Sequence, residues 1–233
     1  MPATVNTIDA RPALVARRLV VTVLMSDVRG YSGIAERTDP MVLAGQLDAH
    51  RREMATAVLD AGGTVIQYAG DAVLAAFGVP GPAPDHRERA CRAAAAMHRR
   101  QRRLDETWAA QGLAPFGLGI GVCTGEVAAA VLGDDERLGF TLVGDTVNLA
   151  ARLQSMAREP GTTVVCAQTA AGLAGTGDGA VALAPTTVRG RVALVQAYRL
   201  AAAAAGATAL QPLVTHRAVL REVPAGGPAR RAA

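Results

Sequence analysis

Residues 18–32 read Arg-Leu-Val-Val-Thr-Val-Leu-Met-Ser-Asp-Val-Arg-Gly-Tyr-Ser, an apolar run that ends in a carboxylate and a glycine-containing turn. The β-branched residues within 18–26 predict a strand that is buried on both faces. Asp27 ends this strand, and Gly30 lies in a turn that opens a helix. Backbone N–H groups at such a turn can bind phosphates. Taken alone, however, Asp27 is better explained as a helix cap.

Hydrophobic periodicity and turn residues place further elements after this strand. In chain order we expect a helix that begins at Pro40 and ends at Gly62–Gly63, strands at 64–67 and 72–77, a helix from 85 to about 108, strands near 116–123 and 126–132 joined at Thr124–Gly125, a helix from 145 to about 157, a strand at 162–166, a short helix at 167–173, and strands at 180–188 and 191–199. The order predicts an α+β fold with a ferredoxin-like βαββαβ core and additional strands and helices.

The length and composition are consistent with one large folded domain. Half of the 233 residues are hydrophobic and 19% are charged, which is typical of a chain with a packed core. We expect residues 1–17 to form a leader, 18–200 to form the domain, and 201–233, rich in Ala, Gly and Pro, to form a flexible tail.

Charge, aromatic content and cysteine spacing exclude several classes of function. The net charge is only +4 and aromatics make up 3%, so we expect no nucleic-acid partner, and the arginine clusters indicate a solvated helix face and a basic tail. No apolar run approaches the roughly 20 residues that span a bilayer, so membrane insertion is not expected. The three cysteines are isolated and favour a reducing cytoplasm.

A second carboxylate, Asp71, favours a metal-binding role for Asp27. Asp71 follows Gly70 in the expected hairpin turn, where a Gly-Asp pair is ordinary. In a ferredoxin-like core the first strand and the hairpin strands are neighbours, so both carboxylates can converge at one end of the sheet. Convergent carboxylates suit Mg²⁺ or Mn²⁺, which take oxygen ligands and bind beside substrate phosphates.

Residues 141–152, Thr-Leu-Val-Gly-Asp-Thr-Val-Asn-Leu-Ala-Ala-Arg, contain the third group of candidate residues. Asn148 and Arg152 are four residues apart on a predicted helix, so their side chains share one face, while Leu149 and Leu153 can reach the core. Asn is a poor residue for a helix interior, which favours a function for it over decoration of the surface.

Four segments together resemble the signature blocks of the class III adenylate/guanylate cyclase family: 23–32, 67–78, 124–127 and 141–153. The resemblance extends over about residues 18–199, in the family's order. It implies a head-to-tail homodimer with shared active sites, in which Asp27, Asp71 and the backbone carbonyl of Val28 bind two Mg²⁺ or Mn²⁺ ions per site. The implied reaction is in-line attack of the ribose 3′-hydroxyl on the α-phosphate, which releases pyrophosphate.

The resemblance also implies roles for residues that do not bind metal. Asn148 would orient the ribose, and Arg152 would stabilise charge that develops on the α-phosphate. The turn of Gly30, Tyr31 and Ser32 would contact phosphates, and so would either Arg189 or Arg191, between which the sequence does not decide.

Base recognition departs from the pattern common in adenylate cyclases. Gln67 stands where many of them have a lysine, and this chain contains no lysine at all, whereas Thr141 matches a known variant of the partner position. A glutamine amide can donate or accept a hydrogen bond. ATP is the preferred substrate, with GTP or mixed specificity as the alternative.

Three other functions have weaker support in the sequence. A degenerate cyclase domain could serve dimerisation or nucleotide sensing, although the joint presence of Asp27, Asp71, Asn148 and Arg152 favours catalysis. A diguanylate cyclase lacks support because its Gly-Gly-(Asp/Glu)-Glu-Phe hairpin is missing. A basic nucleic-acid binder would rest on charge alone.

Overall fold

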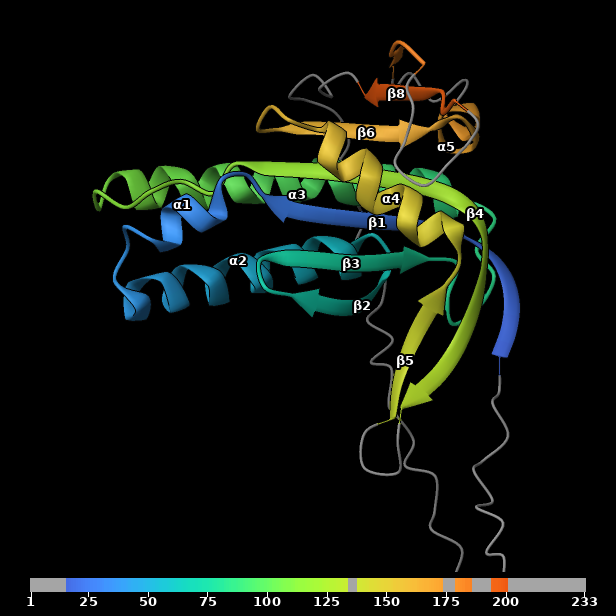
Figure 1. The fold of residues 1–233 in the computed structure, drawn as a ribbon, viewed down its shortest axis with the longest axis horizontal. Coiled ribbons are helices and arrows are strands. Elements are labelled where there is room, and N and C mark those ends of the chain that lie inside the picture. The colour runs from blue at the N-terminus through green and yellow to red at the C-terminus, as the bar shows by residue number, and fades with distance from the viewer. Residues whose placement is uncertain (1–15, 134–137, 174–178, 186–193, 201–233) are drawn as a thin grey trace, which may run out of the picture.

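The computed structural model describes residues 16–133, 138–173, 179–185 and 194–200 (Figure 1). The elements are β1 (Ala16–Val28), α1 (Tyr31–Ala35), α2 (Pro40–Asp60), β2 (Thr64–Ala69), β3 (Ala72–Phe77), α3 (His86–Ala109), β4 (Leu118–Gly133), β5 (Leu138–Val143), α4 (Asp145–Met156), β6 (Thr162–Cys166), α5 (Ala167–Gly172), β7 (Ala180–Ala182) and β8 (Ala197–Leu200). They form one sheet in the order β2-β3-β1-β4-β6-β8-β7, and β5 pairs with β4 outside this path.

β1 lies in the middle of the sheet and is hydrogen-bonded along both edges. It runs antiparallel to β3 on one side and antiparallel to β4 on the other. Val21, Val23 and Leu24 in its centre are fully buried. Neighbouring side chains of a strand point to opposite faces, so Val23 and Leu24 enter two different cores. The predicted burial on both faces is therefore confirmed for the centre of the strand, whereas Arg18 and Val20 at its start are exposed.

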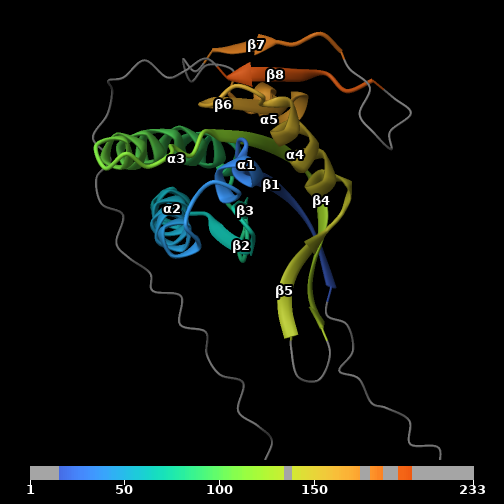
Figure 2. The same ribbon diagram turned by 60° about the vertical axis from the view of Figure 1, so that its left-hand side comes forward.

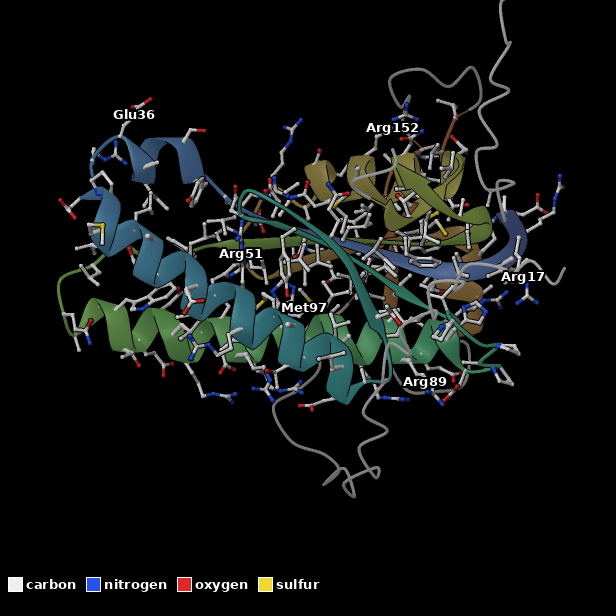
Figure 3. The ribbon with its side chains drawn as sticks, turned by 90° about the horizontal axis from the view of Figure 1, so that it is seen from below. Arg17, Glu36, Arg51, Arg89, Met97 and Arg152 are labelled. Carbon is white, nitrogen blue, oxygen red and sulfur yellow. The ribbon has the colours of Figure 1, made fainter. Side chains whose placement is uncertain are left out.

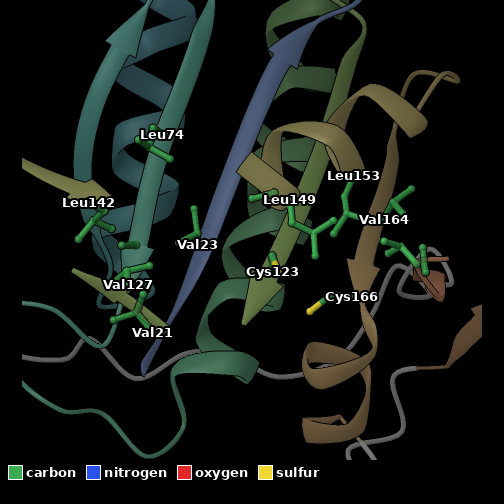
Figure 4. Close-up of a cluster of buried hydrophobic side chains, with 14 of the residues drawn as sticks. Val21, Val23, Leu74, Cys123, Val127, Leu142, Leu149, Leu153, Val164 and Cys166 are labelled. Carbon is green, nitrogen blue, oxygen red and sulfur yellow. The ribbon is translucent and has the colours of Figure 1, made fainter. Parts of the chain in front are cut away.

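Helices cover the two faces of the sheet separately (Figure 2). α2 and α3 pack on one face, where Met54 and Met97 join Leu24 in a fully buried cluster. α4 packs on the other face, where Leu149 and Leu153 meet Val23 (Figure 4). The three long helices occupy the predicted ranges, and Leu149 and Leu153 reach the core as predicted.

The core has the predicted ferredoxin-like topology. Its elements run β1-α2-β2-β3-α3-β4, and these strands lie in the order β4-β1-β3-β2. β5, α4, β6, α5, β7 and β8 are the additional elements that extend this core. The α+β fold is therefore confirmed.

The second half of the sheet differs from the sequence prediction. The two strands expected near 116–123 and 126–132 are one long strand, β4, because Gly125 pairs with Val21 of β1 and makes no turn. β5 was not expected as a strand. β7 and β8 are shorter than the predicted strands at 180–188 and 191–199, and part of each predicted range lies outside the described residues.

The expectations for the chain ends and for membranes have different outcomes. β1 begins at Ala16, so the last two residues of the predicted leader belong to the sheet. The rest of the leader and the predicted tail, 201–233, lie outside the described residues. Within the described ranges, no helix combines the length and apolarity that crossing a bilayer requires.

A buried histidine makes stability depend on pH. His98 on α3 bonds Thr163 of β6 at 3.0 Å, and burial, with Arg102 nearby, lowers its pKa to about 4. The unfolded chain therefore binds more protons between pH 6.5 and 4, so stability falls as pH decreases through this window. We expect the neutral variant His98→Gln to lose about 2 kcal/mol less than the wild type between pH 7 and pH 5 in urea denaturation. Equal losses in both proteins would contradict the assignment.

Candidate active site

The end of β1 presents a carboxylate beside a tight turn. Asp27 is the penultimate residue of the strand and is half-buried. The chain then turns at Gly30, whose φ of 71° lies in the left-handed region that favours glycine. Gly30 caps α1, and its carbonyl accepts a bond from Ile34 N at 3.1 Å. Tyr31 and Ser32, the other residues predicted to contact phosphates, form the first turn of α1.

Asp71 reaches the same place from the β2–β3 hairpin. Gly70, with φ of 62°, makes the turn, and Asp71 follows it directly before β3 begins. One carboxylate oxygen of Asp71 accepts a hydrogen bond from Val28 N at 2.9 Å. The Asp27 and Asp71 side chains are hydrogen-bonded to each other. The structure thus brings together all three residues that were predicted to bind metal.

The surroundings of Asp27 favour its neutral form. Burial, the hydrogen bond with Asp71 and repulsion from its charge raise the pKa of Asp27 to about 7, while Arg29 and the Val28 backbone act in the opposite direction. Like charges at this separation resist joint ionisation. A bound divalent cation is the group that relieves such repulsion, and its preferred ligands are oxygens of this kind.

The donor set fits a cation that also binds substrate. Among the described residues, no group of three or more His, Cys, Asp or Glu side chains could enclose a metal ion by itself. Two carboxylates and a backbone carbonyl leave coordination positions for phosphate oxygens and water, which is how Mg²⁺ is commonly held. The residues present therefore fit Mg²⁺ or Mn²⁺ bound together with a nucleotide.

Arg51 supports the hairpin turn and was not identified from the sequence. Its Nε donates to the carbonyl of Gly70 at 3.2 Å, and its guanidinium lies 5.3 Å from the centre of the Tyr68 ring. Figure 3 shows Arg51 between α2, its own helix, and the strands. An arginine within a long amphipathic helix gives no sequence signal for such a contact, because the contact depends on how the helix packs.

The α4 residues lie on the opposite face of the sheet, as Figure 3 shows for Arg152. Leu149 and Leu153 are buried, whereas Asn148 is exposed and Arg152 is half-buried. Arg152 Nη1 is shielded from solvent and has no hydrogen-bond partner among the described residues. A buried guanidinium N–H without a partner is costly, and a bound anion would satisfy it.

The backbone of α4 packs directly against β4 because β4 has a glycine, Gly121, beneath the helix. A Cβ added to Gly121 would overlap the Ala150 carbonyl and the Gln154 N–H, and would lie 2.8 Å from Gln154 Cα. At the start of α4, the Thr146 hydroxyl donates to the Glu126 carbonyl at 2.8 Å. These contacts hold the helix that carries Asn148 and Arg152.

The two residues predicted to read the base lie on β2 and β5, two strands that contact each other. Gln67 is exposed on β2, and Thr141 is half-buried on β5. Among the described residues, no hydrogen bond or ion pair joins Asn148 or Arg152 to the two aspartates. Arg189 and Arg191 lie outside the described residues.

Comparison with known proteins identifies the class to which this fold and site belong. Residues 15–201 match the family described as the adenylate and guanylate cyclase catalytic domain, so the chain belongs to this family. Adenylate cyclase 1 of Rhizobium meliloti (strain 1021) is 34% identical over 150 residues, which are 64% of this chain. The matched region spans only 23% of that relative's length.

Solved structures of both specificities resemble the chain. The adenylyl cyclase CyaB from P. aeruginosa has a TM-score of 0.77 and 28% identity, with 86% of this chain and 100% of that chain covered. The guanylyl cyclase Cya2 has a TM-score of 0.73 and 28% identity, with 79% and 93% covered. The fold and family therefore leave the choice between adenine and guanine to individual residues.

The close approach of α4 to β4 predicts a severe effect of a single methyl group. Gly121→Ala should displace α4, lowering stability by about 1–3 kcal/mol and reducing cyclase activity by a larger factor than the stability loss explains. Gly45→Ala in α2 is the matched control, since its Cβ would meet nothing within 4 Å and Ala favours helix. Wild-type activity and stability in Gly121→Ala would contradict the proposed contact.

Proposed function

We propose that this domain is an adenylate cyclase, which converts ATP into 3′,5′-cyclic AMP and pyrophosphate at active sites shared between two copies of the chain. The observation that carries the proposal is the meeting of Asp27 and Asp71 at the end of β1, beside the Gly30 turn. The two carboxylates come from different segments of the chain. Because they repel each other when both are ionised, their proximity does not stabilise the fold, which favours a role in binding cations.

The residues at the end of β1 would prepare the triphosphate for reaction. Asp27, Asp71 and the carbonyl of Val28 would hold two Mg²⁺ or Mn²⁺ ions. When bound, such ions lower the pKa of the ribose 3′-hydroxyl and neutralise phosphate charge. N–H groups in the turn of Gly30, Tyr31 and Ser32 would donate to phosphate oxygens. The 3′-hydroxyl would lose its proton to water as its oxygen bonds to the α-phosphorus, and the bond from that phosphorus to the oxygen bridging the α- and β-phosphates would break, so that pyrophosphate leaves in line.

α4 would supply the groups that act on the ribose and the α-phosphate. Asn148 is exposed and can bond the ribose through its amide. Arg152 has a guanidinium N–H with no partner among the described residues, so it can donate to charge that develops as the 3′-oxygen attacks. Because such charge is greatest in the transition state, Arg152 should contribute more to kcat than to binding.

A head-to-tail homodimer would bring these groups together. Within one chain the aspartates and Arg152 serve different sites, so a monomer should be inactive. Tyr68 and Phe140, next to Gln67 and Thr141, remain about 40% exposed. Exposed aromatic side chains beside two base-reading residues are typical of a surface that a second subunit covers. The burial of all three cysteines fits the reducing cytoplasm predicted for this enzyme.

Base preference is the finer part of the proposal. The Thr141 hydroxyl and the Gln67 amide can each donate or accept, so they can match the acceptor nitrogen and amino donor of adenine. The same amide can also turn to match guanine. We therefore propose ATP as the main substrate and GTP as a side substrate.

Complementation tests the shared site. Asp27→Ala and Arg152→Ala should each abolish cyclic AMP formation with Mn²⁺ and ATP. Mixed under conditions of subunit exchange, they should recover about a quarter of wild-type activity, because half of the dimers then contain one intact site. Light scattering would establish that both variants remain dimeric. If confirmed mixed dimers recovered no cyclic AMP formation, the shared-site proposal would be wrong.

Substitution of Gln67 tests base recognition. Gln67→Glu should raise the ratio of kcat/KM for GTP to that for ATP at least about tenfold, since a carboxylate accepts from guanine but cannot donate to adenine. The control Gln67→Leu should lower kcat/KM for both substrates and leave their ratio nearly unchanged. An unchanged ratio in Gln67→Glu would exclude this residue from the base pocket.

A further inference from the structure

Arg29 directly follows the metal-binding end of β1, yet its side chain contacts another part of the fold. Its backbone N–H donates to the carbonyl of Gly117, just before β4 begins. Its Nη2 donates to the carbonyl of Gln154, in the last turn of α4. One residue therefore joins the Asp27–Val28 segment to the helix that carries Asn148 and Arg152.

The space that the guanidinium occupies exists because β4 lacks a side chain there. A Cβ on Gly119 would overlap the Arg29 guanidinium and would lie 2.7 Å from the carbonyl of Ala157, the C-cap residue of α4. The charge of Arg29 thus lies against the C-terminal end of α4. The last carbonyls of a helix lack partners within the helix and carry partial negative charge, so a cation stabilises this end.

The same charge acts on the active-site carboxylate. Arg29 and Asp27 attract each other, which favours the ionised form of Asp27 and opposes the effects of burial and of Asp71. The guanidinium is thereby attracted both to Asp27 and to the carbonyl of Gln154.

Stability alone does not account for an arginine at this position. Its Nε is shielded from solvent and has no hydrogen-bond partner among the described residues. Burial of a charged group with an unsatisfied donor costs free energy that an apolar side chain of similar volume would avoid. The retained charge indicates that the contact serves the geometry of the site.

We propose that Arg29 is a positioning residue that sets the distance between the Asp27 turn and the C-terminal end of α4. This inference rests on the proposed function. In a shared-site dimer the aspartates of one chain serve one active site and its α4 serves the other. Arg29 then couples the metal-binding half of one site to the Arg152-bearing half of the second site.

Hydrogen exchange of the metal-free dimer tests the anchor without any reaction. In Arg29→Gln, amides of residues 153–157 should exchange about tenfold faster than in the wild type, because the last turn of α4 loses its cation. Arg29→Lys, which keeps the charge and folds if the first variant does not, should restore part of the protection. Arg158→Gln is the matched control, since Arg158 is exposed just beyond α4. Unchanged protection in Arg29→Gln would overturn the proposal.

Mixed dimers then separate the two effects. In the pair of Asp27→Ala and Arg152→Ala chains, the active site takes its metal ligands from the Arg152→Ala chain and α4 from the Asp27→Ala chain. Arg29→Gln placed in the Arg152→Ala chain, which supplies the metal ligands, should raise the Mn²⁺ concentration for half-maximal activity about tenfold. Arg29→Gln placed in the Asp27→Ala chain, which supplies α4, should lower kcat about tenfold and leave the Mn²⁺ dependence unchanged.

The outcomes distinguish this inference from the proposed function. An effect from only one of the two placements would reduce Arg29 to a local role and would overturn the coupling. Failure of the parent pair to complement would instead remove the shared-site proposal, while the exchange experiment would still decide whether Arg29 anchors α4.

Discussion

The structure depends on β1 being hydrogen-bonded along both edges and buried on both faces. Pairing with β3 brings Asp71 beside Asp27, because the antiparallel register that matches Ser26 with Val73 leads directly to both aspartates. Pairing with β4 sets Gly121 opposite Met25, and Gly121 is where α4 rests. A slip of one residue in either pairing would turn the carboxylates apart or place a side chain under α4.

Most of the core could be predicted from local sequence patterns. The β-branched run of β1 and the spacing of Leu149 and Leu153 both identify faces that must be buried, and the topology that follows places Asp27 near Asp71. Family resemblance then supplied roles for Asn148 and Arg152, for which the structure gives positions. The ferredoxin-like order was accessible because it follows from short connections between neighbouring elements.

Features that depend on tertiary contacts could not be predicted. Thr124–Gly125 reads as a turn, yet the Thr124 hydroxyl bonds Thr22 at 2.8 Å inside the sheet, and Gly125 makes room for Thr146. Arg29 and Arg51 act on backbone carbonyls distant in sequence, so no spacing marks them. Only packing decides such contacts.

The glycines of β4 and the exposed position of Gln67 differ in what they permit over evolutionary time. Side chains cannot be added at Gly119 or Gly121 without displacing an arginine or a helix, so the parts proposed to perform the chemistry tolerate little variation. Gln67 lies on an exposed part of β2, where replacement disturbs no core. With Gln67 in its proposed role, a single substitution there would change the preferred nucleotide and leave the proposed chemistry in place.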